Sequence, residues 1–254
     1  MEILNSILKS IKEDAPVQQV IRGIHWTAVV SKRCGLASTM ASGGCSHEEG
    51  AYGMEGSFTE MTALALARYC LDGGMSRASL GMAAINSVLD IDPNKHSDVE
   101  GLKLARDLGK GKNLSIIGHF PFMDDLAKAA RNLWVIEKQP KPGDYPEARG
   151  RDFIPQSDIV VISSTTLLND TLPGILELCR EDSIRMLLGP TTPLSEVLFD
   201  YGIDMLAGSV VTDREPVLKS VSEGASFMQL KARGGVRFVS MIKDFDDIVR
   251  RLAA

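Results

Sequence analysis

The chain has 254 residues, of which 44% are hydrophobic and 24% charged, the balance of an ordinary globular protein with a sizeable core. Its formal net charge of -5 argues against nucleic-acid binding driven by neutralisation of phosphates. No apolar run reaches the roughly 18 residues of a membrane-spanning helix, and residues 1–12 lack the pattern of a signal peptide. We therefore expect a cytoplasmic protein with neither a membrane nor a nucleic-acid partner.

The first part of the chain predicts a helix followed by a small meander of strands. Apolar residues at helical spacing over residues 3–13 indicate an amphipathic helix, which Pro16 ends. Residues 17–22 and 25–30 are rich in β-branched side chains and predict two strands, with a third, short strand over residues 36–39.

A long loop and two helices complete this part. Residues 41–57 contain five glycines and no periodicity, which predicts a loop of the kind that is functional or mobile. Helices are expected over residues 59–71, ended by a pair of glycines, and from Ser76 onward. The order of helix, meander and two helices predicts an α+β domain over residues 1–95.

From residue 112 the pattern changes to alternating strands and helices. Strands are predicted over residues 114–118, 133–136, 158–163, 184–188 and 205–211, helices over residues 123–131, 172–179 and 194–201, and a proline-rich connection over residues 139–155. Near-continuous apolar strands between helices are typical of a parallel sheet covered on both faces. We therefore expect the chain to be α/β, with a Rossmann-like second domain over residues 96–254.

Ligands of such a sheet bind beyond the carboxyl ends of its strands, and this position defines the candidate site. The residues that follow the first four strands are Gly118, His119, Phe120 and Pro121; Glu137; Thr165 and Asn169; and Gly189, Pro190, Thr191 and Thr192. We expect them to line a binding site for a small polar molecule.

The chemistry of these residues leaves alternatives open. His119 can act as an acid–base group or a metal ligand, or it can cap the helix that follows. Glu137 lies 19 residues after Gly118, where Rossmann proteins bind ribose hydroxyls, but the sequence lacks the G-x-G-x-x-G fingerprint. The Thr191-Thr192 turn suits an anionic or polar group, or it caps a helix. Thr165 and Asn169 have the same two interpretations.

Other reactive residue types carry weaker patterns. Trp26 lies in a predicted strand and is expected in the core rather than as a stacking platform. Asn86, in an otherwise apolar helix, either faces solvent or forms a hydrogen bond across an interface. Cys70 and Cys179 are expected to be small buried hydrophobes. No nucleophile elbow, Walker motif or HExxH motif is present.

Several phrases together resemble one known family. They are Gly23-Ile-His-Trp-Thr-Ala-Val29, Ala78-Ser-Leu-Gly-Met-Ala-Ala-Ile-Asn86, Gly118-His-Phe-Pro121, Leu187-Leu-Gly-Pro-Thr-Thr-Pro-Leu194 and Leu206-Ala-Gly208. The chain resembles the putative heavy-metal chelatase family over nearly its whole length. The resemblance implies an enolase N-terminal-like domain joined to a Rossmann-like domain, with a pocket between them. It also implies that Asn86 and the Trp26-Thr27 strand approach His119 and Glu137, and that the activity concerns metal chelation or chelator-like and pterin-like small molecules.

Three hypotheses follow. The leading one is a metal-homeostasis protein, a possible homo-oligomer, that holds a small polar molecule or metal chelate in an interdomain pocket, with His119, Glu137 and Asn86 as reactive residues. The second is a Rossmann-type transferase acting on pterin-, flavin- or siderophore-like molecules with a nucleoside cofactor such as S-adenosylmethionine. The third is a non-catalytic carrier of a divalent metal ion that uses Cys34, Cys45 and His47 on the long loop, although their spacing fits no compact metal site.

Overall fold

The computed structural model describes residues 1–40, 56–71, 74–121 and 123–253, and its internal contacts divide the chain into two compact units. The first unit comprises Met1–Ile91 and Ser209–Arg237, and the second comprises Asp92–Gly208 and Phe238–Ala254. This division differs from the prediction of two continuous domains, because residues 209–237 group with the N-terminal part of the chain. The chain passes between the units inside β9 (Met205–Val211) and inside β10 (Val236–Ile242).

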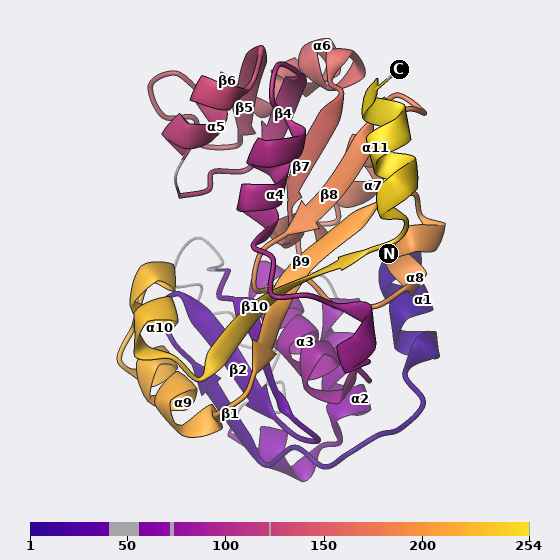
Figure 1. The fold of residues 1–254 in the computed structure, drawn as a ribbon. Coiled ribbons are helices and arrows are strands. Elements are labelled where there is room, and N and C mark those ends of the chain that lie inside the picture. The colour runs from indigo at the N-terminus through magenta and orange to yellow at the C-terminus, as the bar shows by residue number, and fades with distance from the viewer. Residues whose placement is uncertain (41–55, 72–73, 122, 254) are drawn as a thin grey trace. The chain divides into compact units, whose positions relative to one another are not determined.

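The first unit contains the predicted helix and meander (Figure 1). Helix α1 spans Glu2–Ser10, and strands β1 (Gln19–Arg22), β2 (Trp26–Val30) and β3 (Cys34–Ser38) form an antiparallel sheet in that order. The three predicted strands are therefore confirmed to within a few residues.

Strand β2 is buried along its whole length because helices cover both faces of this sheet. Helix α3 (Met75–Val88) packs on one face. Helices α9 (Arg214–Ser222) and α10 (Phe227–Arg233) pack on the other, where apolar side chains of β2 and β3 meet those of both helices. Trp26 belongs to that core, as predicted, and its indole Nε1 donates a hydrogen bond to the carbonyl of Ala225 at 2.9 Å.

Close packing of α3 on the sheet depends on Gly35 in β3. A Cβ atom at this position would lie 2.2 Å from the carbonyl oxygen of Ala83 and 2.4 Å from the amide nitrogen of Ser87. Both atoms belong to the backbone of α3, so no side-chain rotation can relieve the overlap. The absence of a side chain therefore sets the distance between the helix and the sheet.

The helix predicted over residues 59–71 is wrong as a single element. The structure has a 3-10 turn over Phe58–Glu60, a short helix α2 over Ala63–Ala67, and a second 3-10 turn over Arg68–Cys70. Thr62 interrupts the helix because its backbone is extended and its hydroxyl accepts a hydrogen bond from Ala65 N, as an N-cap. The expected glycine-rich loop lies mostly outside the described residues.

In the second unit, the described strands form a seven-stranded sheet in the order β10-β9-β8-β7-β4-β5-β6. The strands not yet defined are β4 (Asn113–Ile117), β5 (Asn132–Glu137), β6 (Tyr145–Pro146), β7 (Ile159–Ser163) and β8 (Ile184–Leu188). The neighbouring pairs from β6 through β9 are parallel. The predicted α/β class with a largely parallel sheet is therefore confirmed. If β4 is numbered 1 and the later strands follow in chain order, the sheet from β6 to β9 has the order 3-2-1-4-5-6, and β10 adds a further strand beside β9. The order 3-2-1-4-5-6 is typical of doubly wound sheets.

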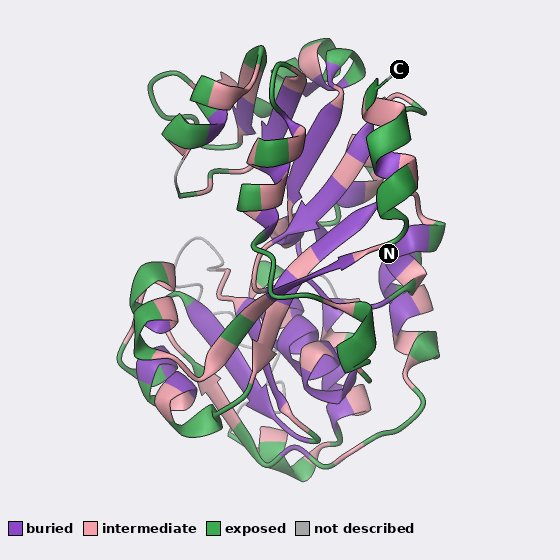
Figure 2. Cartoon of the chain, viewed as in Figure 1, coloured by how far each residue is buried: buried purple, intermediate pink, exposed green. Residues whose placement is uncertain are grey.

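Helices cover both faces of this sheet. On one face, α4 (Gly101–Leu108), α5 (Met123–Ala129) and α11 (Phe245–Ala253) bury apolar side chains against β4, β7 and β8. On the other, Trp134 of β5 stacks on Phe153 of α6 (Gly150–Phe153) at 5.2 Å, and α7 (Leu172–Leu178) lies beside α6. Figure 2 shows the resulting contrast between buried strands and the exposed outer sides of α4 and α11.

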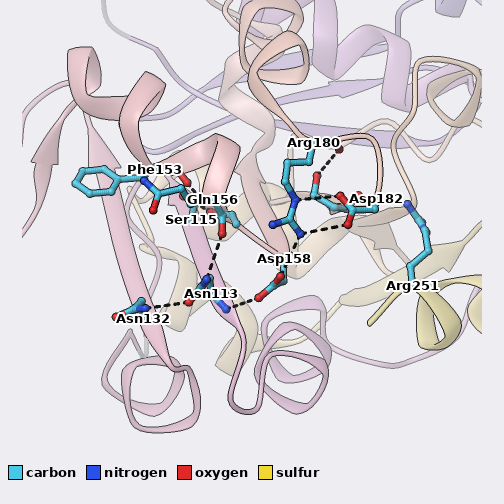
Figure 3. Close-up of polar contacts among 11 residues, drawn as sticks. Asn113, Ser115, Asn132, Phe153, Gln156, Asp158, Arg180, Asp182 and Arg251 are labelled. Carbon is cyan, nitrogen blue, oxygen red and sulfur yellow. Dashed lines mark hydrogen bonds and ion pairs between the residues drawn. The ribbon is translucent and has the colours of Figure 1, made fainter. Parts of the chain in front are cut away.

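Polar contacts join the amino ends of β4, β5 and β7 (Figure 3). The carboxylate of Asp158 accepts hydrogen bonds from the backbone N of Asn113 at 2.8 Å and from Arg180 Nη2 at 3.1 Å. The side chain of Asn132 donates to Asn113 Oδ1 at 2.9 Å. These contacts align the amino ends of the three strands. Because the strands are parallel and of similar length, their carboxyl ends are aligned as well.

Several elements lie outside the predictions. Helix α4 was missed although its apolar residues have helical spacing, and α9, α10, β10 and α11 follow the last predicted strand. The proline-rich connection contains β6 and α6, where only an irregular segment was expected. None of the helices in the described residues has both the length and the apolar character needed to cross a bilayer.

Candidate functional site

A cavity of about 530 Å³ lies at the carboxyl ends of β4, β5 and β7. All of its lining residues belong to the second unit. The chain runs from β4 outward to β5 and β6 on one side, and continues through β7 and β8 on the other, so the cavity marks the point where the strand order reverses. Ligands of doubly wound sheets bind at such a switch point, and the volume is typical of small-molecule sites.

The cavity brings together part of the predicted site. The predicted residues that line it are Gly118, His119, Glu137, Thr165 and Asn169. They come from the ends of β4 and β5 and from the segment that follows β7. This grouping agrees with the expectation that residues after neighbouring parallel strands converge at one edge of the sheet.

Gly118 allows β4 and β7 to approach each other at the base of the cavity. Its φ of 101° is a conformation that favours glycine, and a Cβ atom there would lie 2.9 Å from Cβ of Ser163. Its amide donates a hydrogen bond to the carbonyl of Ile136 at 2.9 Å, which ties the turn to β5. The turn that carries His119 is thereby joined to the strand that ends at Glu137.

Glu137 ends β5, as predicted, and is half-buried. Its Oε1 accepts a hydrogen bond from the backbone N of Lys138 at 2.7 Å, which fixes the carboxylate at the strand end. The ammonium group of Lys138 lies 3.7 Å from the carboxylate of Glu147. Both residues also line the cavity. This part of the lining therefore carries charges of both signs.

The segment after β7 contributes hydroxyl and amide side chains to the lining, together with the carboxylate of Asp170. The Oγ of Ser163 lies 2.8 Å from Oγ1 of Thr165 and accepts a longer hydrogen bond from the backbone N of Thr165. The Oδ1 of Asn169 accepts a hydrogen bond from Thr171 Oγ1 at 2.6 Å. Ser163, rather than Thr165, caps the short 3-10 helix over Ser164–Leu167. The hydroxyl and amide groups offer donors and acceptors without a net charge.

The predicted turn over residues 189–193 does not line this cavity, and its predicted role at a helix N-terminus is wrong. Helix α8 spans only Val197–Asp200 and begins after Glu196. Thr192 does not cap it, and its hydroxyl is buried with no hydrogen-bond partner in the described part of the chain. The physical reason is that Thr192 belongs to a tight turn after β8, in which its amide donates a hydrogen bond to the carbonyl of Gly189 at 2.9 Å. The carbonyl of Thr192 packs close to β9, where a Cβ atom on Gly208 would lie only 2.8 Å from it.

The other predicted positions also lie outside the lining of this cavity. Phe120 packs against the core of the second unit, Pro121 is exposed, and Gly189, Pro190 and the buried Thr191 follow β8. Asn86 donates a hydrogen bond from Nδ2 to the carbonyl of Leu36 at 2.8 Å, within the first unit. Its approach to His119 stays a prediction.

Asp144 is the main residue that the sequence did not single out. Its Oδ2 lies 3.3 Å from Nδ1 of His119, and its side chain is 7% exposed. The available signal was Lys141-Pro-Gly-Asp144, a pattern typical of a type II turn. Asp170 and Thr171 were also missed, although both follow β7 and line the cavity.

Comparison with known proteins identifies the family to which this arrangement belongs. The model of the DUF364 family, described as "Putative heavy-metal chelation", matches residues 100–240. That of DUF4213, with the same description, matches residues 4–89. The chain belongs to the DUF364 family. The resemblance inferred from short sequence phrases is thus confirmed.

Solved structures of DUF364 proteins of unknown function are similar to nearly the whole chain. One from Desulfitobacterium hafniense is 25% identical with a TM-score of 0.78, covering 95% of this chain and 98% of that one. One from Pyrococcus horikoshii is 19% identical with a TM-score of 0.79 and the same coverage, which shows the fold. An uncharacterized protein of Methanocaldococcus jannaschii is 32% identical over 162 residues, which are 60% of this chain and 62% of that protein.

The cysteines of this DUF364 chain bear on the carrier hypothesis. Cys34 begins β3 and is buried in the core of the first unit, so its expected place on the long loop is wrong. Cys45 and His47 lie outside the described residues. Cys70 is buried, as predicted, and Cys179 is half-buried. Among the described residues, no three His, Cys, Asp or Glu side chains lie close enough to hold a metal ion.

We expect Cys34 to resist alkylation in the native protein. Burial raises the pKa of its thiol from the ordinary 9.0 to about 12, although Arg214 acts in the opposite direction. Iodoacetamide at pH 8 should therefore leave Cys34 unmodified, as measured by peptide mass spectrometry, whereas protein unfolded in urea should be modified. The raised pKa also links this thiol to folding. The contribution of the buried, neutral thiol to the free energy of unfolding is fully present below pH 9 and is lost as the pH rises toward 12. Rapid modification at pH 8 would restore Cys34 as a candidate metal ligand.

Proposed function

We propose that the second unit binds a small polar molecule or metal chelate in the cavity at the carboxyl ends of β4, β5 and β7, and that the protein acts in metal homeostasis. The observation that carries the proposal is the convergence of Glu137, His119 and the hydroxyl-bearing segment after β7 on one cavity of about 530 Å³. The description of the family, which concerns heavy-metal chelation, supports the metal-related part.

The charges around the cavity favour a guest with cationic character. Its described lining residues include the carboxylates of Glu137, Glu147 and Asp170 against the one ammonium group of Lys138. A carboxylate in the lining attracts a positive charge on a bound molecule and repels a phosphate group. A metal chelate with exposed hydroxyl, amine or amide groups suits this lining better than a phosphorylated molecule does. In the proposal the chelating molecule supplies most of the coordination positions of its metal.

Each part of the lining then has a distinct role. Glu137 accepts hydrogen bonds from hydroxyl or amine groups of the guest, as it does from the Lys138 amide. Thr165 and Asn169 offer uncharged donors and acceptors in the segment after β7. Such a combination fixes the orientation of a ligand, while the apolar side chains of Ile117, Ile136 and Ile175 bury its less polar parts.

One rival function has a specific observation in its favour. Glu137 lies at the end of the second strand from the switch point, where nucleoside-binding sheets hold ribose hydroxyls. A dinucleotide is disfavoured because the second glycine of the usual fingerprint would occupy position 120, where this chain has Phe120 packed against the core. S-adenosylmethionine carries no phosphate, so it is the nucleoside cofactor whose binding should be tested against that of a metal chelate.

The test is the set of molecules that the purified protein retains. Full-length wild type, Glu137→Ala and Glu177→Ala are purified without chelators, and retained small molecules and metals are measured by mass spectrometry. Glu177 is exposed on α7 and does not line the cavity, so it is the matched control. We expect Glu137→Ala to retain at least about ten-fold less ligand, because a hydrogen bond to a charged group contributes about 1.5–3 kcal/mol.

Two results would overturn the proposal. Equal retention by wild type and Glu137→Ala would remove the cavity as the binding site. Calorimetric binding of S-adenosylmethionine that is lost in Glu137→Ala, with no retained metal or chelator, would establish the rival function instead.

A further inference from the structure

His119 and Asp144 form a pair at the edge of the cavity. The Nδ1 atom of His119 lies 3.3 Å from Oδ2 of Asp144. The carboxylate is 7% exposed, whereas the imidazole is 34% exposed and lines the cavity. One partner is thus enclosed by protein and the other is accessible to a ligand. The enclosed carboxylate can orient the ring without competing for the ligand.

The position of Asp144 is fixed by a tight turn. Lys141-Pro-Gly-Asp144 has proline and a glycine of φ 97° at its two central positions, and Asp144 N donates to the carbonyl of Lys141 at 2.9 Å. These features define a type II turn. The amide of Lys141 in turn donates to Oδ2 of Asp144 at 3.0 Å. The oxygen that faces His119 is therefore held by the backbone of its own turn.

The segment after the turn is anchored to the sheet. Tyr145 and Pro146 form β6, which pairs in parallel with β5 so that Pro146 lies opposite Glu137. The ring of Tyr145 packs against Phe153 at 4.4 Å between centroids. Asp144 is consequently built into the same framework that carries Glu137, and its contact with His119 does not depend on a loose loop.

The contact favours one tautomer of the histidine. A carboxylate oxygen 3.3 Å from Nδ1 attracts a proton on that nitrogen and repels a lone pair there, which favours the form with the proton on Nδ1 and the lone pair on Nε2. Histidines that bind metals typically have a carboxylate or carbonyl beside their other ring nitrogen, as His119 has Asp144. We infer that Asp144 is a positioning residue that presents Nε2 of His119 as the protein's ligand to the metal of a chelate bound in the cavity. The inference rests on the proposed function and assigns its metal contact.

The tautomer can be measured without any ligand. In ¹⁵N-labelled full-length protein, long-range ¹H–¹⁵N spectra distinguish Nδ1–H from Nε2–H, and a spectrum of His119→Gln assigns the signal among the four histidines. Spectra are recorded near pH 8.5, since an ordinary histidine pKa is about 6.5. We expect His119 to be mainly Nδ1–H, whereas histidines in unstructured peptides are mainly Nε2–H.

Variants of the carboxylate separate orientation from stability. Asp144→Ala should shift His119 toward Nε2–H, and Asp144→Asn, which keeps an acceptor oxygen, should retain more of the Nδ1–H form. Asp152→Ala is the matched control, because Asp152 lies in the same connection but is paired with Arg149. It should leave the tautomer unchanged. The melting temperature of each variant shows whether the fold persists.

A copper chelate tests the metal contact. Copper(II)–iminodiacetate leaves coordination positions open, and its electron paramagnetic resonance spectrum reports binding of an imidazole nitrogen. Wild type should bind it, and His119→Gln should abolish that binding. Asp144→Ala should weaken it about ten-fold or more, the usual effect of removing a carboxylate behind a ligating histidine. A His25→Ala/His96→Ala double variant, which alters described histidines outside the cavity, should bind like wild type.

Each result has a definite meaning. An Nε2–H tautomer in the wild type, or no change in Asp144→Ala, would overturn the role of Asp144 even if the Glu137 experiment succeeds. The expected tautomer with equal copper binding by wild type and His119→Gln would overturn the metal contact. Failure of the proposed function is seen separately, as ligand retention that does not depend on Glu137.

Discussion

Replacing Gly35 by alanine should lower the free energy of unfolding by about 3 kcal/mol or more, the upper end for overpacking a core. The added Cβ atom would lie 2.2 Å and 2.4 Å from backbone atoms of Ala83 and Ser87. Neither atom can move without displacing α3, which is buried over most of its surface. Thermal unfolding followed by circular dichroism should show a melting temperature lower by roughly 10 °C, since 1 kcal/mol corresponds to about 2–4 °C at this chain length.

The control is the same substitution at Gly174. No atom lies within 4 Å of a Cβ atom built on Gly174, and the residue lies within helix α7. Alanine should therefore leave the stability unchanged or raise it by up to about 1 kcal/mol through helix propensity. A melting temperature of Gly35→Ala equal to that of the wild type would show that α3 does not pack on β3 as described.

The sequence predicts the elements of the fold better than their assembly. Continuous apolar runs correctly predicted the parallel strands, and alternation of strands with helices predicted their class. The inclusion of residues 209–237 in the first unit was not foreseen, because contacts between distant segments leave no local pattern. One signal was present, however. The run Trp26–Val30 is apolar except for Thr27, and a nearly continuous apolar strand is typical of a sheet that is covered on both faces.

The site was predictable only where chemistry follows from strand position. His119 and Glu137 stand at strand ends, so the general rule for parallel sheets finds them. Asp144 stands in a proline-rich connection, and a turn pattern does not reveal which side chain the carboxylate meets. Thr192 shows the opposite failure, since a threonine before a proline is a plausible cap. Thr192 instead lies in a turn that packs close to Gly208, and the helix begins only at Val197.

Gly118→Ala should both destabilise the second unit and reduce ligand retention. The alanine must adopt a φ of 101°, a conformation that costs a residue other than glycine about 1–3 kcal/mol. In addition, its Cβ atom would lie 2.9 Å from Cβ of Ser163. The clash falls between the ends of β4 and β7, at the base of the cavity. We expect a loss of about 2–4 kcal/mol in chemical denaturation, together with loss of retained small molecules.

Two further variants separate the strain from the clash. Gly111→Ala also places alanine at a positive φ, 69°, but no atom lies within 4 Å of the new Cβ, so it should cost only the strain. In a Ser163→Gly background the clash partner is absent, and Gly118→Ala should then cost only the backbone strain, which is larger at a φ of 101° than at the 69° of Gly111. The difference between the two backgrounds is the coupling energy of a double-mutant cycle. If that coupling is zero, β4 and β7 do not approach at Gly118, and the base of the cavity is not formed by these two residues.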